Sequence, residues 1–213
     1  MGNKLLNGHE VAKWFIFNNH QLANGYIDGN IKLNKLLYFA NLMFYCINRE
    51  LLIEDDFVAF PKGPVIFSIY KDYRYNGLDE IPADDFVNGI NKEQEQILNI
   101  INFLYGNKDV NELVEISHSH NIWNEKKDLI PQNPIIEFDK ISQEFIDYYN
   151  NLYNIYKDMD FSKIRMEKIN GNIFYYDINN LEMNDKVVEQ LLLYDKFDEP
   201  QFIEDVNGEL VFS

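Results

Sequence analysis

The stretch KLNKLLYFANLMFYCI, residues 32–47, decides the fold of this chain. From Leu36 to Ile47 it is apolar on nearly every side of a helix, with Asn41 as the one break. A helix that is hydrophobic all round is enclosed by other elements in a globular protein. The sequence therefore predicts a central helix over Ile31–Arg49, and the apolar run is too short to span a bilayer.

Further helices are predicted on both sides of this central one, because apolar residues recur at helical spacing between turn signals. They cover 9–22, 64–76, 91–105, 109–118 and about 140–157, the last with a stripe of Ile141, Phe145, Tyr148, Leu152, Ile155 and Tyr156. Phe57–Phe60 is predicted as a short strand, and Pro64 is placed in the first turn of the helix that follows it. Residues 1–157 are thus expected to form a mainly α, compact domain of about six helices with one short strand.

The hydrophobic period changes after residue 157, where strand signals replace helix signals. Asn170-Gly171 and Asn207-Gly208 each lie between short apolar runs, and Asn-Gly favours the type I′ turn of a β-hairpin. The segment Lys186–Asp195 lies between the two hairpins and fits either a helix or a strand. Residues 158–213 are therefore expected to form a C-terminal α/β extension that contains β-hairpins.

The formal charge of the chain is −16, and it is concentrated toward the C-terminus. Residues 158–213 hold 13 acidic residues against 5 basic ones, a balance of −8, and residues 1–157 carry the other −8. A field of this sign repels nucleic acid and attracts basic surfaces. We therefore expect a basic protein partner and no direct contact with nucleic acid.

Cysteine usage and the first residues indicate where the protein acts. Cys46 is the one cysteine, so a disulfide framework cannot form. The opening residues, MGNKLL, contain no apolar segment of signal-peptide length. We expect a cytoplasmic protein with no membrane anchor.

Catalytic patterns are scarce in this sequence. It contains neither a Gly-rich phosphate loop nor a Gly-x-Ser-x-Gly elbow. The segment Ser117–His120 places two histidines two residues apart, but on a helix such positions point in different directions. A helix end with capping hydroxyls is the preferred interpretation, ahead of a partner contact or a metal site. No catalytic, cofactor-binding or metal-binding residue is predicted, and we expect no enzyme.

Two lysines are placed unfavourably in the predicted central helix. Lys32 and Lys35 lie near its start at Ile31, where the helix dipole disfavours cations. Two explanations stay open at this point. The acidic run Glu54–Asp56 neutralises the lysines, or they contact an acidic surface of a partner.

Three segments resemble the sequence signature of one family, the Panacea domain. Residues 32–40, KLNKLLYFA, are similar to its KLxKLLYFA motif. Residues 57–70 resemble its F-x-A-W-x-x-G-P-V…Y segment, with Phe60 where Trp is usual. Residues 116–123 resemble its Ser/Thr-His segment that ends in Pro-Trp, with Ile122 where Pro is common. The motifs follow in the right order, and the resemblance covers roughly residues 8–130.

The resemblance implies a mainly helical domain that acts as the antitoxin of a toxin–antitoxin operon and neutralises its toxin by direct protein contact. The candidate partner-binding residues are Lys32, Lys35, Lys62 and Trp123. Trp123 either anchors the core or forms an aromatic hot spot for the partner. The alternative function is a phage-encoded anti-defence protein, or an acidic nucleic-acid mimic, that inhibits a basic host factor. The identity of the toxin and the oligomeric state stay open.

Overall fold

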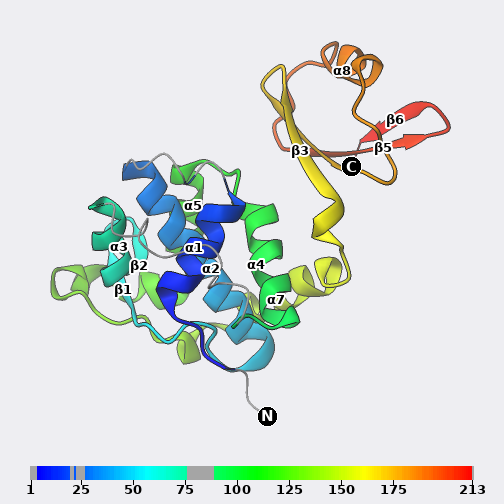
Figure 1. Ribbon diagram of the computed structural model, residues 1–213. Coiled ribbons are helices and arrows are strands. Elements are labelled where there is room, and N and C mark those ends of the chain that lie inside the picture. The colour runs from blue at the N-terminus through cyan, green and yellow to red at the C-terminus, as the bar shows by residue number, and fades with distance from the viewer. Residues whose placement is uncertain (1–3, 20–21, 23–26, 76–88, 213) are drawn as a thin grey trace. The chain divides into compact units, whose positions relative to one another are not determined.

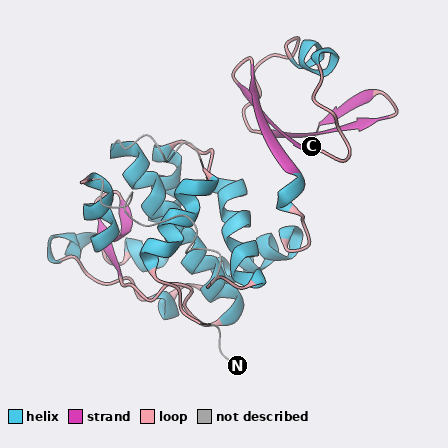
Figure 2. Ribbon diagram, viewed as in Figure 1, coloured by secondary structure: helices cyan, strands magenta, loops and turns pink. Residues whose placement is uncertain are grey.

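The computed structural model describes residues 4–19, 22, 27–75 and 89–212. The chain divides into two compact units, the N-terminal unit Met1–Asp158 and the C-terminal unit Met159–Ser213. Helices make up most of the N-terminal unit, whereas strands and one helix, α8, form most of the C-terminal unit (Figure 2). The expectation of a mainly α protein with a hairpin-containing C-terminal part is therefore correct in outline.

The central helix of the N-terminal unit is α2, Ile27–Asn48, and most of its residues are buried. It contacts α1, Gly8–Asn18; α3, Phe67–Arg74; α4, Lys92–Tyr105; α5, Val110–Ser119; and α7, Gln143–Tyr156 (Figure 1). The prediction of an enclosed central helix is confirmed, although the helix begins four residues earlier than expected. Within the described ranges, neither α2 nor any other helix combines the length and hydropathy needed to cross a membrane.

A β-hairpin, β1 at Phe57–Phe60 and β2 at Gly63–Ile66, lies against α2 and α3. The predicted first strand is confirmed, but the helix predicted from Pro64 is wrong over its first three residues. Gly63 adopts φ +92° and turns the chain back, so that Pro64 pairs with Ala59 in an antiparallel ladder. Pro is tolerated in this two-stranded sheet because its missing N–H can face away from the ladder. The predicted end of the helix, at residues 76 and 77, lies outside the described residues.

Capping side chains define where α4 and α5 begin. Asn91 accepts from the amide of Gln94, whose side chain in turn accepts from the amide of Asn91, so the two form a capping box. Asp109 caps α5 through the amide of Asn111. Both predicted helices are confirmed within a residue. The first predicted helix is shorter than expected, since α1 ends at Asn18. Short helical turns connect α5 to α7: α6, Asn121–Asn124; η4, Lys127–Gln132; and η5, Phe138–Lys140.

The face that α7 buries differs from the predicted stripe. Ile146 and Tyr149 are its buried residues, while Tyr148 and Ile155, both assigned to the stripe, are 49% and 68% exposed. Aromatic and aliphatic residues lie on several sides of this helix, so two apolar rows at helical spacing compete in the sequence. Tyr149 is selected because its hydroxyl reaches a buried histidine, His120.

The C-terminal unit contains a four-stranded sheet in the order β3-β4-β5-β6, in which only β4 and β5 run parallel. Positive φ values at both residues of Asn170-Gly171 and of Asn207-Gly208 are those of type I′ turns, which confirms both predicted hairpins. The ambiguous segment between them is helical as far as Leu191. The remaining elements are η6, Phe161–Lys163; β3, Ile164–Ile169; β4, Asn172–Asp177; α8, Asp185–Leu191; β5, Gln201–Val206; and β6, Glu209–Phe212.

Asn41, the one polar break in the apolar run, holds the segment that follows α2. Its side chain is 1% exposed, and its Oδ1 accepts from the amides of Leu52 and Ile53 at 2.9 and 3.0 Å. The amide of Leu6 in turn donates to the carbonyl of Leu52 at 2.8 Å. One buried side-chain amide therefore fixes the chain that leads into β1.

We expect Asn41→Leu to lower the free energy of unfolding by at least about 2 kcal/mol, because it leaves two buried N–H groups without acceptors. Urea unfolding followed by far-UV circular dichroism measures the change. Asn151→Leu, at an exposed position of α7, is the matched control and should stay within about 0.5 kcal/mol of the parent. Equal stability of the two variants would contradict the role of Asn41.

Candidate functional site

Buried amide side chains of α2 attach the hairpin and α3 to the central helix. Asn34 is fully buried, and its Oδ1 accepts from the amide of Ile66 at 3.0 Å. Its Nδ2 donates to the carbonyl and the side-chain oxygen of Asn30. Asn30 then donates to the carbonyl of Tyr70 at 2.8 Å. This chain of hydrogen bonds fixes the positions of β2 and α3 relative to α2.

Lys35 lies next to Asn34 and is also fully buried. Its Nζ donates to the carbonyl of Pro64 at 2.9 Å, so it contacts the hairpin just beyond the Gly63 turn. A Cβ on Gly63 would lie 2.7 Å from the Lys35 Nζ and 2.4 Å from the Ser117 Oγ. Residue 63 must therefore be glycine for two reasons, its left-handed backbone and the lack of space.

The charge of Lys35 is poorly compensated. Burial lowers the pKa of its ammonium group from 10.5 to about 7. Within the described part of the chain, its Nζ forms no ion pair with a carboxylate. The same amine lowers the pKa of nearby His118, in addition to a larger effect of burial on that ring. Lys35 therefore lies close to balance between its charged and neutral forms near neutral pH.

Lys32 is buried elsewhere on α2 and donates from its Nζ to the carbonyl of Gly106 at 3.1 Å, at the end of α4. Burial lowers its pKa, and the carboxylate of Asp109 partly opposes that shift. Because α2 begins at Ile27, Lys32 and Lys35 lie beyond the first turn, and the expected dipole penalty is smaller than assumed.

In the contacts that the structure describes, no residue of the acidic run 54–56 forms an ion pair with Lys32 or Lys35. Glu54 accepts from the side chain of Asn7, and Asp55 accepts from the amide of Gly8 at the start of α1. The lysines of α2 are instead held by backbone carbonyls. These two acidic residues thus stabilise the N-terminus of α1, where the helix dipole favours negative charge.

The two histidines of the Ser117–His120 segment have separate surroundings. His120 is in the core, where hydrogen bonds join its Nδ1 to the Tyr38 hydroxyl at 3.0 Å and its Nε2 to the Tyr149 hydroxyl at 3.3 Å. Burial lowers the pKa of His120 to about 3, so the ring is neutral. The His118 ring stacks on Trp123, with centroids 3.5 Å apart. Across the described ranges, no three His, Cys, Asp or Glu side chains gather to hold a metal ion.

Trp123 connects α6 to the hairpin. It is 7% exposed, and its indole Nε1 donates to the carbonyl of Phe60 at 3.1 Å. The indole ring also stacks on the imidazole ring of His118. These contacts favour the interpretation of Trp123 as a core anchor rather than as an exposed hot spot.

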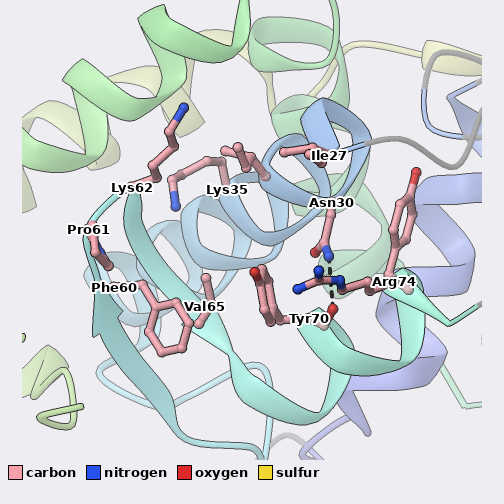
Figure 3. Close-up of a pocket in the computed structure, with 11 residues that line it drawn as sticks. Ile27, Asn30, Lys35, Phe60, Pro61, Lys62, Val65, Tyr70 and Arg74 are labelled. Atoms are coloured by element: carbon pink, nitrogen blue, oxygen red, sulfur yellow. Dashed lines mark hydrogen bonds between the residues drawn. The ribbon is translucent and has the colours of Figure 1, made fainter. Parts of the chain in front are cut away.

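A pocket of about 460 Å³ opens between the first half of α2, the hairpin and α3, a size that suits a small ligand or a few side chains. Eleven described residues line it, most of them apolar or aromatic, and none is acidic. Lys35, Lys62 and Arg74 are its basic residues, one from each of the three surrounding elements (Figure 3). Lys62 and Arg74 are exposed, whereas Lys35 is buried beneath the surface of the pocket.

The structure brings together only some of the predicted site residues. Lys35 and Lys62 border one pocket, whereas Lys32 and Trp123 are not among the residues that line it. Arg74 also lines the pocket, and sequence reasoning missed it. It is an ordinary basic residue in the last turn of a helix, a position that is common for purely structural reasons.

The N-terminal unit is therefore a helical domain with a pocket that three basic side chains line. Residues 33–124 match the family described as antitoxin SocA-like, Panacea domain. This match confirms the resemblance of the three sequence motifs to the Panacea domain. No curated protein and no solved structure matches the chain.

We expect the stability of the protein to rise between pH 7 and pH 9. In the unfolded chain Lys35 keeps its proton up to about pH 10.5, but in the folded protein only up to about pH 7. The unfolded state therefore binds more protons in this window, and the free energy of unfolding increases with pH. Lys35 contributes at most about 1.4 kcal/mol per pH unit.

Urea unfolding of the parent and of Lys35→Met at pH 7, 8 and 9 measures this dependence. The variant should show a weaker pH dependence, with any remaining rise due to Lys32, whose pKa is also lowered. Above pH 9 the buried Cys46 acts in the opposite direction, because its pKa is raised from 9.0 to about 12. If the free energy of unfolding rises equally with pH in parent and variant below pH 9, the pKa of Lys35 is not lowered by burial.

Gly63→Ala should destabilise the hairpin more than Gly171→Ala destabilises its own turn. Both positions have positive φ, which costs a residue with a side chain about 1–2 kcal/mol. A Cβ at Gly171 meets nothing within 4 Å, whereas a Cβ at Gly63 displaces Ser117 and Lys35. Hydrogen exchange at the amides of β1 and β2, compared with those of β3 and β4, measures the two local opening energies. An equal loss of local opening free energy in the two variants would contradict the close packing around Gly63.

Proposed function

We propose that this protein is an antitoxin that neutralises a cognate protein toxin by binding it directly. The observation that carries the proposal is the Panacea domain at residues 33–124, a family described as antitoxin SocA-like. All three basic residues of the pocket lie within the matched range, as do β1, β2 and α3. A non-catalytic mode of action fits this family and requires only a surface that recognises the toxin.

Two features of the chain support a protein as the partner. Large hydrophobic side chains are exposed at the pocket: Ile27, which lines it, is 80% exposed, and Phe67, whose ring packs against the lining residue Phe60, is 49% exposed. Exposed apolar residues around a pocket with polar groups are typical of a protein-binding surface. The charge of −16 favours fast association with a toxin that is basic overall.

The test begins with the full-length chain carrying an affinity tag, expressed in its native host and cross-linked before purification. Each co-purifying protein is then expressed alone in a bacterial host, and again together with the full-length chain. We expect one of these proteins to arrest growth when expressed alone and to be harmless when co-expressed. The purified pair should form a stable complex, because the inhibition is stoichiometric rather than catalytic.

Two results would count against an antitoxin. In the first, no co-purifying protein inhibits growth. In the second, a trace of the chain relieves inhibition without forming a complex, which indicates an enzyme. An acidic nucleic-acid mimic predicts a third result, in which DNA or RNA competes with the chain for its partner.

A further inference from the structure

The pocket of the N-terminal unit has a charge opposite to that of the protein as a whole. The chain carries −16, yet the described residues that line the pocket include three basic residues and no carboxylate. Within the described residues, Lys35, Lys62 and Arg74 form no ion pair. Other lysines of the same unit do, such as Lys126 and Lys140, which both bind Glu137. A locally positive site is therefore enclosed in a negative field.

Lys35 provides a further reason for an anion at this site. Its ammonium group can donate three hydrogen bonds, and the structure shows one, to the Pro64 carbonyl. A buried cation without a counter-charge is unfavourable, and a nearby carboxylate would relieve that cost. Figure 3 shows Lys35 reaching from α2 toward the hairpin, on the side of the pocket where Lys62 lies. A bound anion near Lys62 would thus also stabilise the charge beneath the surface.

The remainder of the pocket requires an apolar group on the same ligand. Phe60, Val65 and Tyr70 line it, and the rings of Phe60 and Tyr70 pack with centroids 5.5 Å apart. The volume of about 460 Å³ accommodates a few side chains but no folded domain. A small inorganic anion would leave these apolar walls unused, and nucleic acid would be repelled by the overall charge.

We propose that this pocket binds a short acidic segment of a protein partner, in which a large hydrophobic side chain lies next to carboxylates. The hydrophobic side chain packs against Phe60, Val65 and Tyr70 in the pocket, and the carboxylates meet Lys62 and Arg74 at the exposed edges. This inference rests on the proposed function in that the partner is a protein. A partner that is basic overall but has one acidic segment can place only that segment in the pocket. The pocket therefore fixes the orientation of the partner and helps to distinguish it from other basic proteins.

Selection from phage-displayed random heptapeptides on the immobilised full-length chain tests the proposal. Non-specific attraction to a chain of −16 enriches basic peptides, so enrichment of Asp or Glu next to Phe, Leu, Ile, Tyr or Trp can only come from a locally positive site. Synthetic peptides of the selected sequences are then measured by fluorescence anisotropy. Their amide counterparts, with Asn for Asp and Gln for Glu, should bind at least tenfold more weakly.

The decisive variant is Lys62→Glu/Arg74→Glu, in which both residues are exposed and the fold should be retained. Lys92→Glu/Lys127→Glu is the matched control, because it makes the same change in net charge at exposed residues that do not line the pocket. We expect the pocket variant to bind the acidic peptides at least tenfold more weakly, and the control to bind them as the parent does. Basic or neutral consensus peptides, or binding by the pocket variant within twofold of the parent, would overturn the proposal.

The toxin identified by growth rescue separates this inference from the antitoxin assignment. A toxin that binds the control variant but not the pocket variant supports both the antitoxin assignment and the pocket as the binding site. A toxin that binds the pocket variant as tightly as the parent overturns the pocket as the binding site and leaves the antitoxin assignment intact. If no toxin is found, the antitoxin assignment fails, and the peptide measurements still decide what the pocket binds.

Discussion

The N-terminal unit depends on one constraint: three polar side chains in the buried interior of α2, those of Asn34, Lys35 and Asn41, need hydrogen-bond partners in the chain that encloses them. Asn34, Lys35 and Asn41 are cut off from bulk water. Their partners are backbone groups of residues 52–66, namely the amides of Leu52, Ile53 and Ile66 and the carbonyl of Pro64. A buried polar group without a partner lowers the free energy of unfolding by a sizeable fraction of a domain's net stability. The side chains of the helix therefore position the hairpin as firmly as its own strand pairing does.

The same constraint separates the residues that build the pocket from those that give it charge. In the family pattern that residues 57–65 resemble, the Gly-Pro turn is fixed, and the position of Lys62 is open. Lys35 belongs to the KLxKLLYFA motif, but it is buried under the hairpin. Lys62 and Arg74 are exposed and make no contact that the fold requires among the described residues. Substitutions at Lys62 or Arg74 can thus change the charge of the pocket without removing the hydrogen bonds that hold the hairpin on α2.

The sequence could predict α2 and the two Asn-Gly hairpins because each signal is local: a continuous apolar run, or a dipeptide suited to one turn type. It could not predict that Pro64 extends a strand, because the turn at Gly63 depends on Lys35, which comes 28 residues earlier. The buried face of α7 was also missed, since Tyr149 is chosen by a hydrogen bond to His120 and not by its spacing. Of the three basic residues of the pocket, the sequence predicted Lys35 and Lys62. It could not predict Arg74, because that residue is brought to the pocket only by the packing of α3 on α2.

The hydrogen bonds between α2 and residues 52–66 also determine when the domain can fold during synthesis. Only α1 leaves the ribosome before α2, so Asn34, Lys35 and Asn41 emerge on an apolar helix that most of its neighbours do not yet cover. Their acceptors and donors are made only once the chain has grown past Ile66, and the hydroxyl of Tyr149 reaches His120 later still. Part of the apolar surface of α2 therefore stays exposed to solvent until α7 has been translated. Chaperone contact on the nascent chain should be concentrated on this helix.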